Sequence, residues 1–347
     1  YVQGAGSNPW TGSIARALEN RSLKWETTDT KNIGFDFGLF GNHLNGNINY
    51  YINETRDLLI TRRIAPSAGL DNPTLNVGKM RNQGFELELN WNDKINDFEY
   101  NVGFNISTIA NKVVALANED QTIYGVGLKY GTEHFPTQTK VGKPIGAFYL
   151  YQADGIFQSL EEVQAHKNSK GELLQPNAQP GDVRFKDMNG DGVIDEDDKT
   201  YSGTGIAKVE ANLNLGASYK GFDFSAVIGS AFGNKIYNGI RYYYEGMNSG
   251  SNFLKTTLNA WTPTNTKTDI PRAVFGDPNQ NTRESTRFLE NGDFVRLRQV
   301  QLGYTLPKAL SKHIYCESIR FYVSAENVFT ITGYSGANPE FSQGVLN

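Results

Sequence analysis

The sequence predicts an all-β protein, an antiparallel transmembrane β-barrel segment with long extracellular loops. Segments of about eight to ten residues alternate apolar and polar side chains, as strands with one apolar face do. The composition is only 38% hydrophobic but 12% aromatic, with 36 glycines in 347 residues. Short turns also alternate with long connections, which is typical of outer-membrane barrels.

The clearest hairpin lies at residues 32–53, where a Gly-Asn turn joins two alternating runs. Asparagines fill one face of the second run, and Asp36 lies on the same face of the first. We expect this face to line a polar lumen and the other to meet lipid. The side chains expected to face lipid in the first run are Ile33, Phe35, Phe37 and Leu39.

The same unit recurs along the chain, so eight strands are expected. Their lengths suit strands that cross a membrane at the usual tilt. Residues 142–151 are a candidate for a ninth strand, which would require a partner that the pattern does not identify. The expected strands are 33–39, 44–53, 85–91, 98–106, 211–219, 222–228, 294–306 and 318–329.

The longest connection, 109–207, is expected to be an extracellular loop region. It can hold a complete extra hairpin but not a single spanning strand, because the flanking strands must keep their direction. A short helix is expected at 159–166, with Ser159 as N-cap. Both ends of the eight-strand set lie on the long-loop side, so we expect strands before Tyr1 and one more strand after Asn347.

Charge and motif content disfavour several functions. With 33 Lys and Arg against 37 Asp and Glu, nothing indicates nucleic-acid binding. The single cysteine, Cys316, cannot form an internal disulfide, and no apolar run is long enough for a transmembrane helix. Glu86 and Glu88 could be imagined as a glycosidase pair, but lumen charges are the better interpretation. We therefore expect no enzyme activity and no catalytic residues.

The sharpest motif is an acidic loop at 187–198. It matches the calcium-loop template of acid or amide side chains at alternate positions followed by glycine. The last position is aspartate rather than glutamate and no helices flank the loop, so the expected Ca²⁺ site is structural and weak. The alternative is an acidic turn held by its own hydrogen bonds. The expected ligands are Asp187, Asn189, Asp191, the Val193 carbonyl, Asp195 and Asp198.

Aromatic side chains gather near the expected strand ends. Most fit an interfacial girdle. Three consecutive tyrosines in the loop after residue 233 are weak candidates for stacking on a substrate; they are Tyr242, Tyr243 and Tyr244.

Several stretches carry a family resemblance across nearly the whole chain. They are LKWETT at 23–28, NQGFEL at 82–87, GDVRFKD at 181–187, FVRLRQV at 294–300 and AENVF at 325–329. These motifs resemble the SusC/RagA family of TonB-dependent outer-membrane transporters. Residues 1–347 would then be the C-terminal part of a 22-stranded barrel, lacking the plug and the last strand.

The resemblance implies TonB-dependent uptake of oligosaccharides or peptides across the outer membrane of a Gram-negative, Bacteroidota-like cell. The implied partners are a SusD-like surface lipoprotein, and TonB with ExbB and ExbD through an N-terminal part that this chain does not contain. Membrane lipid and lipopolysaccharide would surround the barrel. The alternative class is a soluble or surface-attached, calcium-dependent glycan-binding adhesin.

Overall fold

A computed structural model describes most of the chain. The described residues are 2–3, 9–10, 23–61, 67, 69–71, 73–76, 78–116, 122–125, 128–130, 132–248, 250, 252–313 and 315–340.

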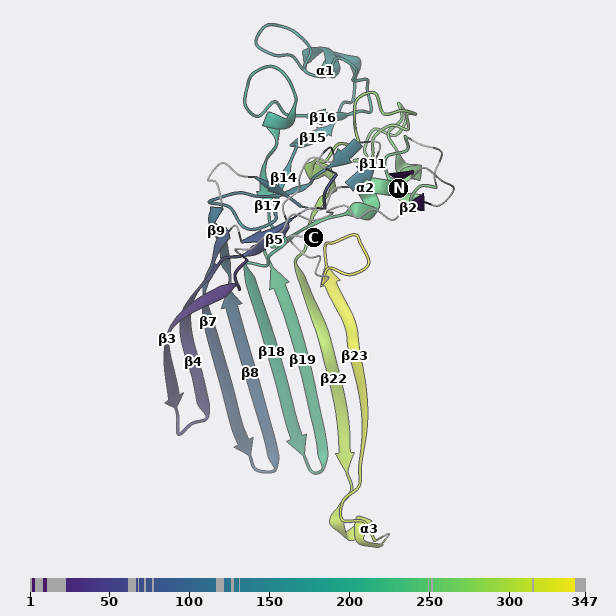
Figure 1. Ribbon diagram of the computed structural model, residues 1–347. Coiled ribbons are helices and arrows are strands. Elements are labelled where there is room, and N and C mark those ends of the chain that lie inside the picture. Colours follow the sequence, from purple (N-terminus) through teal and green to yellow (C-terminus); the bar gives the residue numbers. More distant parts are fainter. Residues whose placement is uncertain are drawn as a thin grey trace.

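One large antiparallel sheet dominates the described residues (Figure 1). Its eight long strands follow the order β23-β22-β19-β18-β8-β7-β4-β3. The shorter strand β9 (Ala110–Leu116) pairs with residues 78–83 at the start of β7. All eight expected strands are present. Their bounds are β3 (Thr27–Leu39), β4 (Leu44–Arg56), β7 (Gly78–Ile95), β8 (Phe98–Thr108), β18 (Val209–Tyr219), β19 (Phe222–Phe232), β22 (Phe294–Thr305) and β23 (Arg320–Thr332).

The two faces of this sheet differ in chemistry, as predicted. Pairing places Leu213 beside Phe104 and Ile228, so apolar side chains share one face across neighbouring strands. Ile33 is 73% exposed and Phe35 is 66% exposed on this face. An apolar sheet face of this size must be removed from water, and the acyl chains of a membrane would do this. Other side chains of the apolar face with large exposure are Phe85, Phe222, Leu302, Phe321, Val323, Phe329 and Ile331.

Short turns join the strands at one end of the sheet, here called the turn end (Figure 1). Lys220 and Gly221 both have positive φ, as a two-residue hairpin turn that follows the strand twist requires. The connection between β22 and β23 carries a short helix, α3 (Lys308–His313), which the sequence pattern did not predict.

The long connections gather at the opposite end, here called the loop end (Figure 1). Small sheets form there, including one with the order β10-β13-β14-β17. Buried apolar clusters also lie in this region, among them Val113 with Leu116 and Ile145. The short strands are β1 (Val2–Gln3), β2 (Pro9–Trp10), β5 (Leu59–Thr61), β6 (Thr74–Asn76), β10 (Ile123–Tyr124), β11 (Leu128–Tyr130), β12 (Thr132–His134), β13 (Thr137–Thr139), β14 (Ala147–Leu150), β15 (Ala153–Ile156), β16 (Val183–Phe185), β17 (Thr200–Gly203), β20 (Lys235–Tyr237) and β21 (Leu289–Asn291).

The candidate ninth strand at 142–151 does not join the large sheet. Only Ala147–Leu150 is extended, as β14, and it pairs with β13 and β17 at the loop end. The expected helix is confirmed as α1 (Leu160–Ala165), whose N-cap Ser159 accepts a hydrogen bond from the Glu162 amide. The remaining helical segments are α2 (Gly239–Tyr244) and the 3₁₀ turns η2 (Glu196–Asp198), η3 (Lys255–Asn259) and η4 (Thr286–Phe288). In the described residues, no helix is long and apolar enough to cross a membrane.

Candidate functional site

The polar face of the large sheet is the first candidate site. Pairing sets five polar side chains in one row across five strands: Asp36, Asn47, Glu88, Asn105 and Asn212. Asn212 donates to the Asn105 side-chain oxygen at 2.9 Å, and Asn47 donates to Glu88 at 3.1 Å. Because its amides both donate and accept and its two carboxylates accept, this wall suits polar groups that carry hydrogen-bond donors.

Glu86 and Glu88 do not form a carboxylate pair for acid–base chemistry. They lie two residues apart on one strand, and both oxygens of Glu88 are engaged by amides, from Asn47 and from Asn90 at 2.9 Å. Glycosidase carboxylates instead flank a scissile bond from opposite sides. The interpretation of both residues as charges of a polar wall therefore stands.

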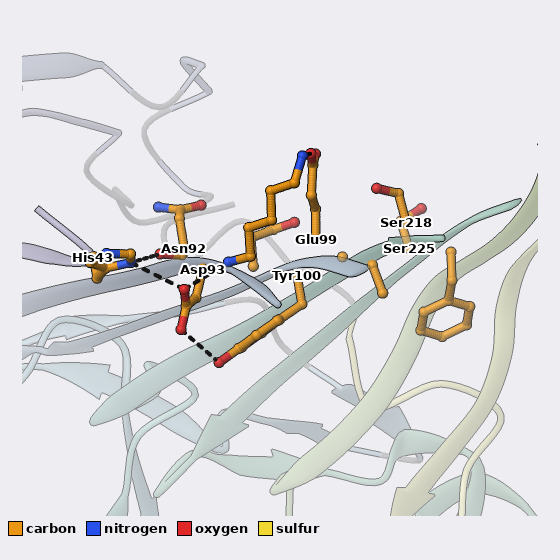
Figure 2. A pocket seen from close by; sticks show the side chains of 12 residues that line it. His43, Asn92, Asp93, Glu99, Tyr100, Ser218 and Ser225 are labelled. Atoms are coloured by element: carbon orange, nitrogen blue, oxygen red, sulfur yellow. Dashed lines mark hydrogen bonds and ion pairs between the residues drawn. The ribbon is translucent and has the colours of Figure 1, made fainter. Parts of the chain in front are cut away.

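A shallow hollow of about 580 Å³ lies at the turn end of β7, β8, β18 and β19 (Figure 2). Glu99 and Ser218 point to one side of the strands, whereas Asp93 and Tyr100 point to the other. The Lys94–Glu99 ion pair measures 2.6 Å, but its side chains are 61% and 57% exposed. An exposed pair of this kind contributes little free energy, so we assign the hollow no chemistry.

The acidic loop at 187–198 lies at the loop end, and its side chains bind the loop's own backbone. Asp187 accepts hydrogen bonds from the Gly190 and Gly192 amides at 2.7 and 2.9 Å. Asp198 is fully buried and accepts from the Met188 and Asp195 amides at 2.6 and 2.8 Å. These two acids therefore hold the start and end of the loop together.

The remaining expected calcium ligands lie on the outer side of this loop. Asn189 donates to Asp191 at 2.9 Å, and Asp191 also accepts from the Val193 amide at 2.9 Å. Asp195 accepts from the Asp197 amide at 3.0 Å as N-cap of η2. Among the described residues, no group of three or more His, Cys, Asp or Glu side chains is arranged to hold a metal ion. Each carboxylate oxygen has two lone pairs, so Asp187 and Asp191 can accept these backbone hydrogen bonds and still offer oxygen ligands to a cation.

The three consecutive tyrosines lie on α2 and differ in exposure. The Tyr242 ring is fully buried and packs edge-on against Phe288 at 5.5 Å. Tyr243 is half-buried, and its ring meets that of Tyr242 at 5.1 Å. Tyr244 is 47% exposed. Substrate stacking by this segment stays a prediction, and Tyr244 is the member placed to make it.

A buried polar network joins the 109–207 region to the next long connection, and the sequence pattern gave no sign of it. Asp182, which is fully buried, accepts two hydrogen bonds from Arg272 at 2.8 and 3.1 Å and one from Asn281 at 2.9 Å. Lys199 forms a buried ion pair with Glu284. The two long connections therefore form one packed unit above the sheet.

A second polar contact, also missed from the sequence, brings the segment after β23 back onto the polar face. Glu340 accepts from Arg296 and Arg298 at 2.7 Å each, and Asn338 accepts from Arg296 at 2.6 Å. Both arginines sit on β22, next to the register shift between Leu297 and Gln299. The shift lets Arg298 lie over the bare backbone of Gly229.

A comparison with protein families decides the identity of this sheet. The family model described as TonB dependent receptor-like, beta-barrel matches residues 2–328. The chain belongs to this family. Its members are receptors and transporters rather than enzymes, and the sheet described above matches their barrel, so the predicted family and fold class are confirmed.

Two relatives within the TonB-dependent receptor family come from Formosa agariphila and Bacteroides thetaiotaomicron. TonB-dependent receptor P3 of Formosa agariphila is 30% identical over 337 residues, covering 96% of this chain and 32% of the relative. TonB-dependent receptor SusC of Bacteroides thetaiotaomicron is 27% identical over 337 residues, covering 94% of this chain and 31% of SusC. The chain thus spans about a third of the length of these relatives.

A solved structure shares the same barrel architecture. The RagAB peptide transporter matches with a TM-score of 0.74 and 26% identity, covering 93% of this chain and 34% of the matched chain. The RagAB peptide importer in its "open-open" state matches with a TM-score of 0.72 and 25% identity, covering 94% of this chain and 33% of that chain.

Proposed function

We propose that the receptor containing this chain is a TonB-dependent importer of oligosaccharides or peptides in the outer membrane. The observation that carries the proposal is the eight-strand antiparallel sheet with one apolar and one polar face, in a chain of the TonB-dependent receptor family. In this arrangement the turn end faces the periplasm and the loop end faces outward. The soluble adhesin alternative does not account for so large an exposed apolar sheet face.

The polar face supports passage of neutral polar cargo rather than catalysis. Its amides supply donors and acceptors beside the carboxylates of Asp36 and Glu88, which suits sugar hydroxyls and peptide groups equally. The match to the RagAB peptide transporter supports peptides as one substrate class, and the SusC/RagA resemblance of the sequence supports oligosaccharides as the other.

We further propose a SusD-like surface lipoprotein as the partner at the loop end and TonB, energised by ExbB and ExbD, as the partner on the periplasmic side. The packed unit formed by the long connections offers a firm surface for a lid, because Asp182, Arg272, Lys199 and Glu284 tie its parts together. The match to the two-component RagAB importer supports this partnership.

The test is uptake by cells that carry the intact receptor. Fluorescent oligosaccharides and fluorescent oligopeptides would be offered in parallel to wild-type cells and to cells lacking the receptor or TonB. We expect one substrate class to accumulate only when receptor and TonB are both present. Accumulation that does not depend on either protein would contradict the proposal.

Calcium at the acidic loop is a separate proposal. Its support is the spacing of the acids in the sequence and the close approach of Asp187, Asn189 and Asp191 around two glycine turns. The ion would be structural, taking oxygen ligands from these side chains and from the Val193 carbonyl, Asp195 and Asp198. It would hold the loop-end unit in shape where a lid protein could contact it.

A further inference from the structure

The apolar face of the sheet ends in a charged cluster at the loop end of β3, β4, β7 and β9. Side chains alternate along each strand, so the positions beyond Ile33, Tyr50 and Phe85 on the same face can be read from the pairing. These positions carry five cationic and two acidic side chains, an excess of three positive charges. They are Lys31, Arg56, Lys79, Arg81 and Lys112 with Asp29 and Glu54.

Glu54 organises the centre of this cluster. Its side chain is 16% exposed and pairs with Lys79 at 2.8 Å and with Arg81 at 2.5 Å. Arg56 pairs with Asp29 at 2.6 Å and lies 4.0 Å from Glu54. Two acids thus pair with three cations on the outward face.

The other two cations have no acidic partner among the described residues. Lys31 is exposed on β3, and Lys112 is exposed on β9 beside Arg81. Three strand spacings separate these two lysines, a width of roughly 14 Å. The cluster therefore presents a broad cationic surface whose charge its own acids do not neutralise.

The position of the cluster indicates what it meets. The rings of Tyr50 and Phe85 lie 4.8 Å apart, tilted by 45°, on the strand positions beneath it, and aromatic side chains gather in this way at a membrane interface. Lys31 lies two residues beyond that level, and Arg81 and Lys112 lie about two residues further. At roughly 3.3 Å per residue, the cations occupy the depth of lipid headgroups rather than of acyl chains.

We propose that this cluster binds the phosphate groups of a phosphorylated glycolipid in the outer leaflet. Arg and Lys are the side chains that recognise phosphate, and Arg does so with two parallel hydrogen bonds. The apolar face immediately below accepts the acyl chains of the same lipid. The proposal rests on the outer-membrane location proposed above but not on the transported substrate or the lid partner.

The test uses the intact receptor in phosphatidylcholine nanodiscs, titrated with fluorescent lipid A. The double variant Lys31→Gln/Lys112→Gln removes the two cations that have no acidic partner among the described residues, so folding should persist. We expect its affinity to fall by roughly fivefold for each lysine removed. Glu54→Gln leaves the cations and removes their central acid, so it should bind more tightly than the wild type.

Matched controls separate this site from general charge attraction. The double variant Lys94→Gln/Lys312→Gln removes the same charge at the turn end and should bind like the wild type. Removing the phosphates from lipid A should weaken its binding to the wild type at least as much as the Lys31→Gln/Lys112→Gln substitutions weaken the binding of phosphorylated lipid A. Millimolar inorganic phosphate should not compete, because a free anion lacks the contact with the apolar face.

Equal losses in both double variants would overturn the proposal, as would equal binding of phosphorylated and phosphate-free lipid A. Competition by inorganic phosphate at the same affinity would mean a site for free anions and would also overturn it. Failure of the outer-membrane location itself would appear differently, as a receptor whose apolar face does not contact acyl chains in any lipid.

Discussion

Replacing Leu213 with arginine tests which face of the sheet meets lipid. Leu213 lies next to the middle of the eleven-residue strand β18, and pairing puts it between Phe104 and Ile228 on the apolar face. A charged side chain at the membrane midplane costs about 2–4 kcal/mol on the lipid side of a barrel. We expect Leu213→Arg to lower the free energy of unfolding of the intact receptor by that amount.

The matched control is Asn212→Arg, one residue away on the polar face. Its cost is the lost hydrogen bond to Asn105, about 1 kcal/mol, because the new cation can remain hydrated. Both variants would be measured by denaturant unfolding of the receptor in lipid vesicles. Equal costs, or a larger cost for Asn212→Arg, would refute the assignment of the two faces.

Three further predictions concern the loop end. Asp182→Asn leaves Arg272 without its buried partner and should lower the free energy of unfolding of the loop-end unit by about 3 kcal/mol. This is near the lower limit for a broken buried pair, because Arg272 is 25% exposed. Proteolysis of the loop-end unit at increasing temperature measures the loss, and the control Asp154→Asn, at an exposed ion pair, should cost less than about 1 kcal/mol. Chelation of Ca²⁺ should increase protease nicking of residues 153–207, Asp191→Ala should mimic it and Asp197→Ala should not; an unchanged nicking pattern would contradict the calcium proposal. Burial lowers the pKa of His166 below its ordinary 6.5, so the unfolded chain binds more protons and stability falls as pH drops from 6.5 toward that lowered pKa. His166→Gln should flatten this acid limb in thermal unfolding at pH 5 to 7, and an unaltered slope would exclude His166 as its source.

The long strands could be predicted from the sequence because each has one apolar and one polar face. The alternation at 98–106 and 211–219 gives both the strand and its orientation, and the structure extends these strands by only a few residues. Polar turns such as Lys220-Gly221 fix where each hairpin reverses.

The loop-end unit could not be predicted in the same way. Its strands are short, and β14 is buried at nearly every position, so it shows no alternation that distinguishes it from an apolar segment of a long strand. The helix α2 has no acidic first turn, and of its three tyrosines Tyr242 packs against Phe288 of η4.

The contacts that hold the candidate site together depend on residues far apart in the chain. Asp182 and Arg272 are 90 positions apart, and nothing in either neighbourhood indicates the other. Glu340 reaches Arg296 and Arg298 only because the register shift in β22 turns both arginines to the polar face. The acidic loop was visible as a motif, but its hydrogen bonds to its own backbone follow from glycine turns that spacing alone does not describe.

The most direct test of the membrane-barrel assignment is the accessibility of spin labels placed singly at 211–219 in the intact receptor within outer membranes. We predict that labels at Ala211, Leu213, Leu215 and Ala217 collide with oxygen dissolved in lipid, whereas labels at Asn212, Asn214 and Ser218 collide with a water-soluble nickel chelate. The two collision rates should therefore alternate with a period of two residues along β18. Equal access of the nickel chelate to both sets of positions would contradict the assignment of this chain to a membrane-spanning barrel.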